Sequence, residues 1–152
     1  MEKIASFQVD HTVLLPGMYL SRRDGDVTTF DLRFKRPNTG DLLTNAELHS
    51  VEHILATLLR NGPHRDAVIY FGPMGCQTGF YFLFDSRRLT DAQAVELVKE
   101  AFAAGAAWAD PMPGKSAAEC GNYVNLDTAL ARAQCAYYSE VIRDWSADRL
   151  SY

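Results

Sequence analysis

The segment from Thr44 to Pro63 constrains the fold most, because both of its ends and its inner face can be read from the residues. Glu47 follows Thr44 at capping-box spacing, and Asn61-Gly62-Pro63 are stop signals, so we expect a helix that runs to about Arg60. Its apolar residues recur at helical spacing on one face: Leu48, Val51, Leu55, Leu58 and Leu59. Such a stripe needs a second layer to pack against.

Strand patterns flank this helix on both sides. Residues 12–21 and 27–34 surround Asp24-Gly25, a hairpin signal, and residues 67–71 and 79–85 surround a loop of small residues. In the second run Phe30, Leu32 and Phe34 alternate with Asp31 and Arg33. A period of two predicts a half-buried strand with its polar side chains facing away from the core.

Two more helices complete the expected order. Thr90 caps a predicted helix over 91–108, a Pro/Gly-rich connection covers 109–123, and a last helix is expected over about 127–145. We find no repeat and no linker, so residues 1–152 are expected to form a single domain. The order predicts an α+β fold, with an antiparallel sheet packed on one face by helices.

Composition excludes several classes of protein. The chain of 152 residues carries a net charge of −4 and no basic stripe, which argues against a nucleic-acid partner. No apolar run approaches the roughly 20 residues that a membrane span needs, and no secretory signal is visible at the N-terminus. Three cysteines cannot all pair with one another, so we expect reduced thiols and a cytoplasmic location.

The sequence His49-Ser50-Val51-Glu52-His53 places half of the four histidines one helical turn apart, beside the apolar stripe. Residues at i and i+4 share a helix face, so both imidazoles can reach one divalent transition metal, with Glu52 on the same edge. The alternative is two surface histidines with a chance glutamate neighbour. The same pattern is also the inverted-zincin signature of a zinc metallopeptidase.

A catalytic metal needs a third protein ligand. Candidates are His11, His64, the carboxylates and the cysteines; Cys120, beside a glycine in a flexible connection, is the most attractive. Its alternative is that of most free cysteines, a small buried apolar residue, and this interpretation suits Cys135 better because apolar residues surround it in the last helix. Cys135 is therefore assigned a structural role.

Cys76 lies in the tight loop "GPMGCQTG" between two predicted strands. A thiolate there can act as a base, while the alternative is an ordinary β-turn with a half-buried cysteine. From these residues alone, the two interpretations are equally balanced.

Five motifs, read together, resemble the S-ribosylhomocysteinase (LuxS) family. They are "DH" at 10–11, "FDLRF" at 30–34, "HSVEH" at 49–53, "GPMGCQTGFY" at 72–81 and "ECG" at 119–121. The resemblance follows the family's motif order from the N-terminus to the final helix. One departure is visible: where the family often has "DISPMGC", this chain has "YFGPMGC", so Tyr70 stands in place of an acidic residue near the amino-acid end of the substrate.

The resemblance implies cleavage of S-ribosylhomocysteine to homocysteine and 4,5-dihydroxy-2,3-pentanedione, the autoinducer-2 precursor, in methyl-cycle recycling. It implies a homodimer with active sites at the interface and one divalent metal per subunit, natively Fe²⁺, replaceable by Zn²⁺ or Co²⁺. The implied metal ligands are His49, His53 and Cys120, and the implied acid/base pair is Glu52 and Cys76. Positions that contact the substrate from the partner chain match Ser6, His11 and Arg33.

Two other classes of function remain beside this lyase. One is the metallopeptidase, although its signature usually has a glutamate, not a cysteine, as third ligand. The other is a non-catalytic metal or interaction domain. Structural zinc sites usually close all four positions with protein ligands, and only three obvious ones are present here.

Overall fold

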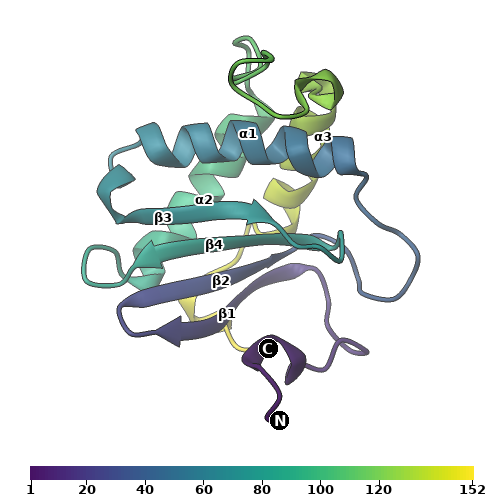
Figure 1. Ribbon diagram of the computed structural model, residues 1–152. Helices are drawn as coiled ribbons and strands as arrows, with labels where there is room; N and C mark the ends of the chain where they lie inside the picture. The colour runs from purple at the N-terminus through teal and green to yellow at the C-terminus, as the bar shows by residue number, and fades with distance from the viewer.

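The computed structural model describes residues 1–152 and has the predicted α+β architecture (Figure 1). One antiparallel sheet, in the order β1-β2-β4-β3, contains β1 (Gly17–Asp24), β2 (Val27–Arg33), β3 (Val68–Pro73) and β4 (Gly79–Asp85). The helices are α1 (Asn45–Asn61), α2 (Asp91–Ala106) and α3 (Thr128–Val141). None of these helices combines the length and the apolar character that crossing a membrane requires.

Local capping sets where the first two helices begin. Thr44 and Glu47 form the predicted capping box of α1, and Thr90 and Gln93 form a second one at the start of α2. Helix α1 ends at Asn61, with Gly62 as its C-cap, one residue beyond the predicted end. The predicted starts of both helices are confirmed. They could be predicted because each capping signal involves residues that are close in the sequence.

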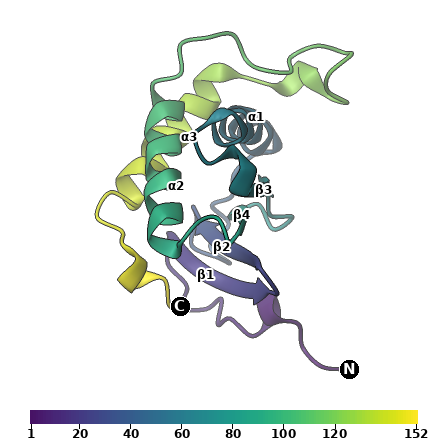
Figure 2. The same cartoon turned by 90° about the vertical axis from the view of Figure 1, so that its left-hand side faces the viewer.

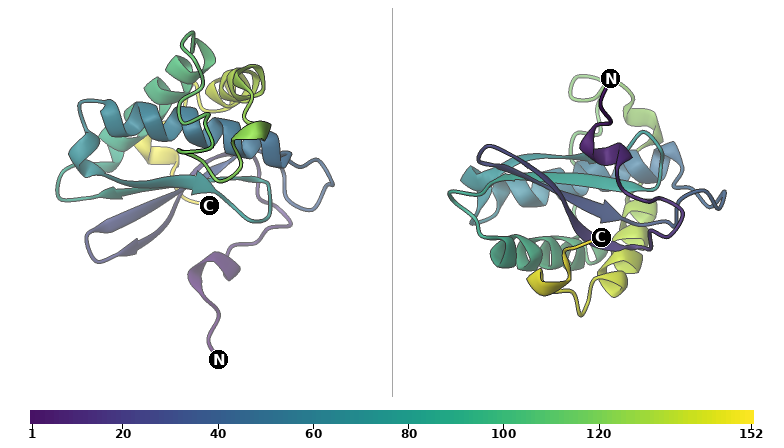
Figure 3. Two further views of the ribbon diagram at one scale, coloured as in Figure 1. Left: turned by 45° about the horizontal axis from the view of Figure 1, so that its top comes forward. Right: turned by 90° about the horizontal axis from the view of Figure 1, so that it is seen from below.

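Aromatic side chains join the sheet to its helical layer. Phe34, just past the end of β2, stacks on Tyr138 of α3 with ring centroids 4.1 Å apart and lies 5.6 Å from Phe102 of α2. Phe71 of the edge strand β3 also packs against Phe102, so β2 and β3 contribute to one core with the helices. Figure 2 shows all three helices gathered on one side of the sheet. The first residues project away from this body, on the side opposite α1 (Figure 3).

Several predicted boundaries are wrong, and the helix expected to reach residue 108 ends at Ala106. The strand expected over 12–21 begins only at Gly17, because Asp10 accepts hydrogen bonds from both the backbone N–H and the hydroxyl of Thr12 and holds a turn there. The last helix ends at Val141 instead of near residue 145. Past it the chain turns so that Trp145 lies on Gly17, where a Cβ would come within 2.3 Å of the indole ring.

The buried face of α1 also differs from the predicted stripe. Leu58 is only partly buried, whereas Ile54 and Ser50 are fully buried. The Ser50 hydroxyl accepts a hydrogen bond of 2.9 Å from the backbone N–H of Asp127, which explains a polar residue in this position.

The expectation of a half-buried β2 is wrong as well. Asp31 and Arg33 point to the face of the sheet away from the helices, yet their residues are only 1% and 2% exposed. They form an ion pair of 2.5 Å. Both faces of this strand are therefore covered. Its apolar side chains face the core under the helices, and its charged side chains face a second buried layer on the opposite side of the sheet.

Candidate metal centre and active site

Helix α1 and the connection before α3 bring together three side chains of the kinds that bind metals. His49 and His53 lie one turn apart on α1, with ring centroids 4.6 Å apart and planes nearly perpendicular. The Sγ atom of Cys120 lies 3.3 Å from Nε2 of His49. One ligand atom from each of the three residues lies within 4.8 Å of the others, so the group can hold a metal ion.

The outer nitrogens of both imidazoles have hydrogen-bond partners. Nδ1 of His49 lies 2.6 Å from Oδ1 of Asn125, and Nδ1 of His53 lies 2.8 Å from the carbonyl oxygen of Pro113. Both partners are acceptors, so each Nδ1 carries the proton and each Nε2 keeps a free lone pair. Two such nitrogens and a thiolate are donors that suit Zn²⁺ and Fe²⁺, so the residues present fit the metal that the sequence predicts.

Gly114 allows the late connection to approach His53. Its φ angle is +67°, a left-handed conformation that favours glycine, and a Cβ built on it would lie 3.0 Å from Nδ1 of His53. A side chain at this position would press on the ring from the same side as the Pro113 carbonyl.

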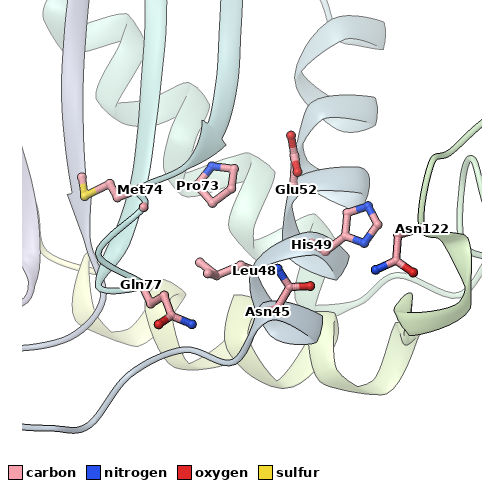
Figure 4. A pocket seen from close by; sticks show the side chains of 9 residues that line it. Asn45, Leu48, His49, Glu52, Pro73, Met74, Gln77 and Asn122 are labelled. Carbon is pink, nitrogen blue, oxygen red and sulfur yellow. The ribbon is translucent and has the colours of Figure 1, made fainter.

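Glu52 lines a cavity of about 450 Å³ together with His49. Figure 4 shows the lining side chains on α1, on the turn between β3 and β4, and at Asn122 of the late connection. Burial raises the pKa of Glu52, and the charges of His49 and His53 oppose that rise. A half-buried carboxyl with a raised pKa, beside a candidate metal centre, can both take up and release a proton.

Cys76 lies on the same turn but opens to a neighbouring cavity. Gly75 and Gln77 line the cavity of Glu52, whereas Cys76 and His11 line a second cavity of about 530 Å³. The turn is tight: Gln77 has a φ of +62°, and its N–H donates to the carbonyl of Met74. The thiol is thus held at the boundary between the two cavities, exposed to a ligand.

Arg33 lies beside this thiol within the same chain. Its Nη1 atom donates to Oγ1 of Thr78 at 2.7 Å and lies 3.9 Å from the sulfur of Cys76, while Thr78 Oγ1 lies 3.0 Å from that sulfur. Asp31 neutralises the charge of the guanidinium and holds its Nε and Nη2 atoms. Nη1 is therefore left to point toward Thr78 and Cys76. The guanidinium places positive charge where a thiolate would form.

The remaining predicted site residues lie on other elements. His11 bonds through Nδ1 to the carbonyl of Val9 at 2.9 Å, and Ser6 lies in the short 3₁₀-helix Ala5–Phe7 and lines neither cavity. Cys135 is fully buried in α3, as predicted.

Tyr70 is half exposed on the edge strand β3, and its ring lies across Gly72. A Cβ on Gly72 would come within 2.0 Å of the tyrosine hydroxyl. The absence of a side chain at residue 72 therefore makes room for the aromatic ring at residue 70.

Sequence reasoning did not find the residues that orient the site. Asn125 and Pro113 belong to no motif, and Asp31, although part of "FDLRF", is expected from the sequence only to face away from the core. The Pro113-Gly114 dipeptide was a turn signal, but nothing in its spacing pointed to His53.

The fold and the site together define a class: α+β domains in which two histidines and a cysteine that could hold one metal ion stand beside a cavity lined by a glutamate. The family model described as S-Ribosylhomocysteinase (LuxS) matches residues 4–148. The chain belongs to this family.

Curated relatives cover the whole chain. A protein of Desulfotalea psychrophila is 47% identical over 160 aligned positions, and one of Clostridium acetobutylicum is 43% identical over 157; both alignments span 100% of this chain and 99% of the relative. A Borreliella burgdorferi protein is 40% identical over 161 positions. All three are named S-ribosylhomocysteine lyase. These matches give no support to the metallopeptidase alternative.

Proposed function

We propose that this chain is an S-ribosylhomocysteine lyase that releases homocysteine and 4,5-dihydroxy-2,3-pentanedione. The observation that carries the proposal is the membership of nearly the whole chain in the family, with His49, His53 and Cys120 gathered beside the cavity of Glu52. The methyl-cycle role and the autoinducer-2 precursor follow from these products.

The chemistry explains why this reaction needs both a metal and proton-transfer groups. The thioether carbon of the substrate has no neighbouring carbonyl, so the sulfur cannot leave directly. The open sugar must move its carbonyl from C1 to C2 and then to C3, after which a proton next to the carbonyl becomes acidic and the sulfur leaves by β-elimination. The two migrations only relocate protons and electron pairs. The elimination breaks one C–H and one C–S bond and forms a C=C bond, the leaving sulfur takes up a proton as homocysteine, and the resulting enol tautomerises to the pentanedione.

The metal ligands in this proposal are His49, His53 and Cys120. A bound divalent ion supplies Lewis acidity that stabilises negative charge on the sugar oxygens. Fe²⁺ is the proposed native ion, one per subunit, with Zn²⁺ and Co²⁺ as replacements, since two imidazoles and a thiolate suit all three. Anaerobic purification followed by elemental analysis tests this, and Cys120→Ala should lose the metal.

Glu52 and Cys76 are the proposed proton carriers. Glu52 stands beside the candidate metal centre, and its raised pKa supports a role in both protonation states. Cys76 stands at the boundary of the two cavities with the Arg33 guanidinium beside it, which supports a thiolate base. Each transfer group contributes roughly 10² to 10⁴ in rate.

A homodimer is proposed because the N-terminal segment is exposed and apolar. Ile4, Phe7 and Val13 are 58%, 70% and 68% exposed, which leaves large apolar side chains open to a partner. A partner chain would cover them and could present its own Ser6 and His11 to the substrate. Light scattering on the purified protein measures the oligomeric state, and a monomer at active concentrations would contradict the dimer.

A reducing compartment suits three free cysteines, two of them in the site, and we propose the cytoplasm.

The deciding assay follows release of free thiol from S-ribosylhomocysteine by the metal-loaded protein, with anaerobic handling. Cys76→Ala should abolish release while keeping a full metal equivalent. Cys135→Ala is the matched control, because it also removes one thiol but lies outside both cavities, and its turnover should persist. Undiminished release by Cys76→Ala would remove Cys76 from the mechanism, and no release by the wild-type protein would contradict the lyase.

A further inference from the structure

Tyr152 is about half exposed, but its ring and hydroxyl pack against the sheet beside β2. The backbone N–H of Leu20 in β1 donates to the carbonyl of Leu150 at 2.7 Å, so the C-terminal segment follows the edge of the sheet. The ring of Tyr152 then stacks on Tyr19, with centroids 4.9 Å apart and planes inclined by 14°. Its hydroxyl donates to Oδ2 of Asp31 at 2.8 Å.

Asp31 receives three hydrogen bonds on its two carboxylate oxygens. Oδ1 accepts from Nε of Arg33 at 3.1 Å, and Oδ2 accepts from Nη2 of Arg33 at 2.5 Å and from the hydroxyl of Tyr152. Because Asp31 and Arg33 are both almost fully buried, neither water nor another side chain replaces a lost donor without rearrangement. Tyr152 and Arg33 thus donate hydrogen bonds to the same carboxylate oxygen of Asp31.

The free end of the guanidinium points at the thiol turn. Nη1 of Arg33 donates to Thr78 and lies 3.9 Å from the Cys76 sulfur. Tyr152, Asp31, Arg33 and Cys76 therefore form one continuous chain of polar contacts, from the C-terminus across the outer face of the sheet to the thiol.

Three tyrosines from neighbouring elements face the Asp31–Arg33 ion pair and remain neutral. Burial raises the pKa of Tyr19 from β1, of Tyr81 from β4 and of Tyr138 from α3, and the Asp31 charge raises each further. The guanidinium of Arg33 is the positive charge that directly adjoins the thiol, while Arg22 and Arg149 act on these tyrosines from the periphery.

We propose that Tyr152 is a positioning residue for the Cys76 thiol, acting through Asp31 and Arg33. When the Tyr152 hydroxyl is present, it supplies one of the hydrogen bonds that the Asp31 carboxylate accepts. The Arg33 guanidinium then stays directed toward Thr78 and can attract a thiolate at Cys76. Without that hydroxyl, the carboxylate depends on Arg33 alone and draws the guanidinium toward itself. The use of the thiol in turnover rests on the proposed lyase function, whereas its reactivity does not.

The test compares Tyr152→Phe with the wild type in the metal-loaded protein. The rate of Cys76 alkylation by iodoacetamide is followed across pH, and mass spectrometry of the Cys76 peptide separates it from the other cysteines. We expect the rate at neutral pH to fall about three- to tenfold and the midpoint of the pH–rate profile to rise by about 0.5 to 1 pH unit, since one unit corresponds to about a factor of ten. In turnover, kcat should fall with KM little changed.

Tyr137→Phe is the matched control. It also removes a tyrosine hydroxyl that bonds to the protein, here to the carbonyl of Phe34 at 2.9 Å, but has no contact with Asp31. Its alkylation profile should follow the wild type. A second variant, deletion of Tyr152 alone, should shift the profile in the same direction as Tyr152→Phe, and thermal melts establish that each variant is folded.

Two results overturn the proposal: a wild-type alkylation profile in both Tyr152 variants, or an equal shift in Tyr137→Phe. Failure of the lyase assay would contradict the proposed function without touching the alkylation result, so the two failures are distinguishable.

Discussion

Asn125→Ala tests how the candidate metal centre is oriented. The substitution removes the acceptor that lies 2.6 Å from Nδ1 of His49, and also the Nδ2 donor that bonds to Asn45 at 2.6 Å. His49 can then rotate, and its proton is no longer confined to Nδ1. The free Nε2 lone pair, which the metal needs, is lost for part of the time.

The expected loss is one to two orders of magnitude in metal affinity. Outer partners of metal-binding histidines typically contribute 10- to 100-fold, which corresponds to about 1.4 to 2.7 kcal/mol of binding free energy. The short 2.6 Å contact and the second bond to Asn45 place Asn125 in the upper part of this range. Titration of the metal-free protein with Co²⁺ against a coloured chelator measures the dissociation constant directly.

Two further variants make the result specific. Asn125→Asp keeps an acceptor for His49 and should retain most of the affinity. Asn122→Ala changes the same connection, but Asn122 reaches Cys120 only through its backbone N–H, so its affinity should stay near that of the wild type. A wild-type dissociation constant for Asn125→Ala, or an equal loss in Asn122→Ala, would refute the reasoning.

Three other perturbations have defined outcomes. Gly114→Ala should weaken Co²⁺ binding about tenfold in the same titration, because the new Cβ meets the His53 ring at 3.0 Å. Ser50→Ala should lower the free energy of unfolding in urea by about 1 to 3 kcal/mol, because the buried N–H of Asp127 loses its acceptor. Burial raises the pKa of Cys135 from 9 to about 12, so this thiol ionises at lower pH in the unfolded chain than in the folded one. The stability that the buried neutral thiol contributes is therefore complete below pH 9 and is lost as the pH rises toward 12. Cys135→Ala should make the denaturant midpoint fall less steeply over this alkaline range.

The features predicted correctly from the sequence are those encoded by neighbours in the chain. Capping residues define the starts of α1 and α2, and the i, i+4 spacing on α1 brings His49 and His53 together. Cys120 was a candidate third ligand because of its flexible, glycine-containing surroundings, and its sulfur lies at 3.3 Å from His49.

The features that were missed depend on contacts between distant segments. An alternating strand cannot reveal that its polar face is closed over, since Tyr152 reaches Asp31 from 121 residues away. The partners of the two imidazole Nδ1 atoms lie in a connection without regular structure, where no periodicity guides prediction. No glycine or proline marks the end of α3 in the sequence, and the chain leaves the helix after Val141 to bring Trp145 onto Gly17, a contact between distant residues.

The arrangement of Tyr70 over Gly72 has an evolutionary consequence. In the family motif these two positions carry an aspartate and a serine, and a serine Cβ at 72 would occupy the place of the tyrosine hydroxyl. With a serine still at residue 72, a tyrosine introduced at residue 70 would have to turn its ring into solvent. With glycine at residue 72, the ring can pack against the backbone instead. The two sites should therefore covary among homologues, with bulky aromatics at the first accompanied by glycine at the second.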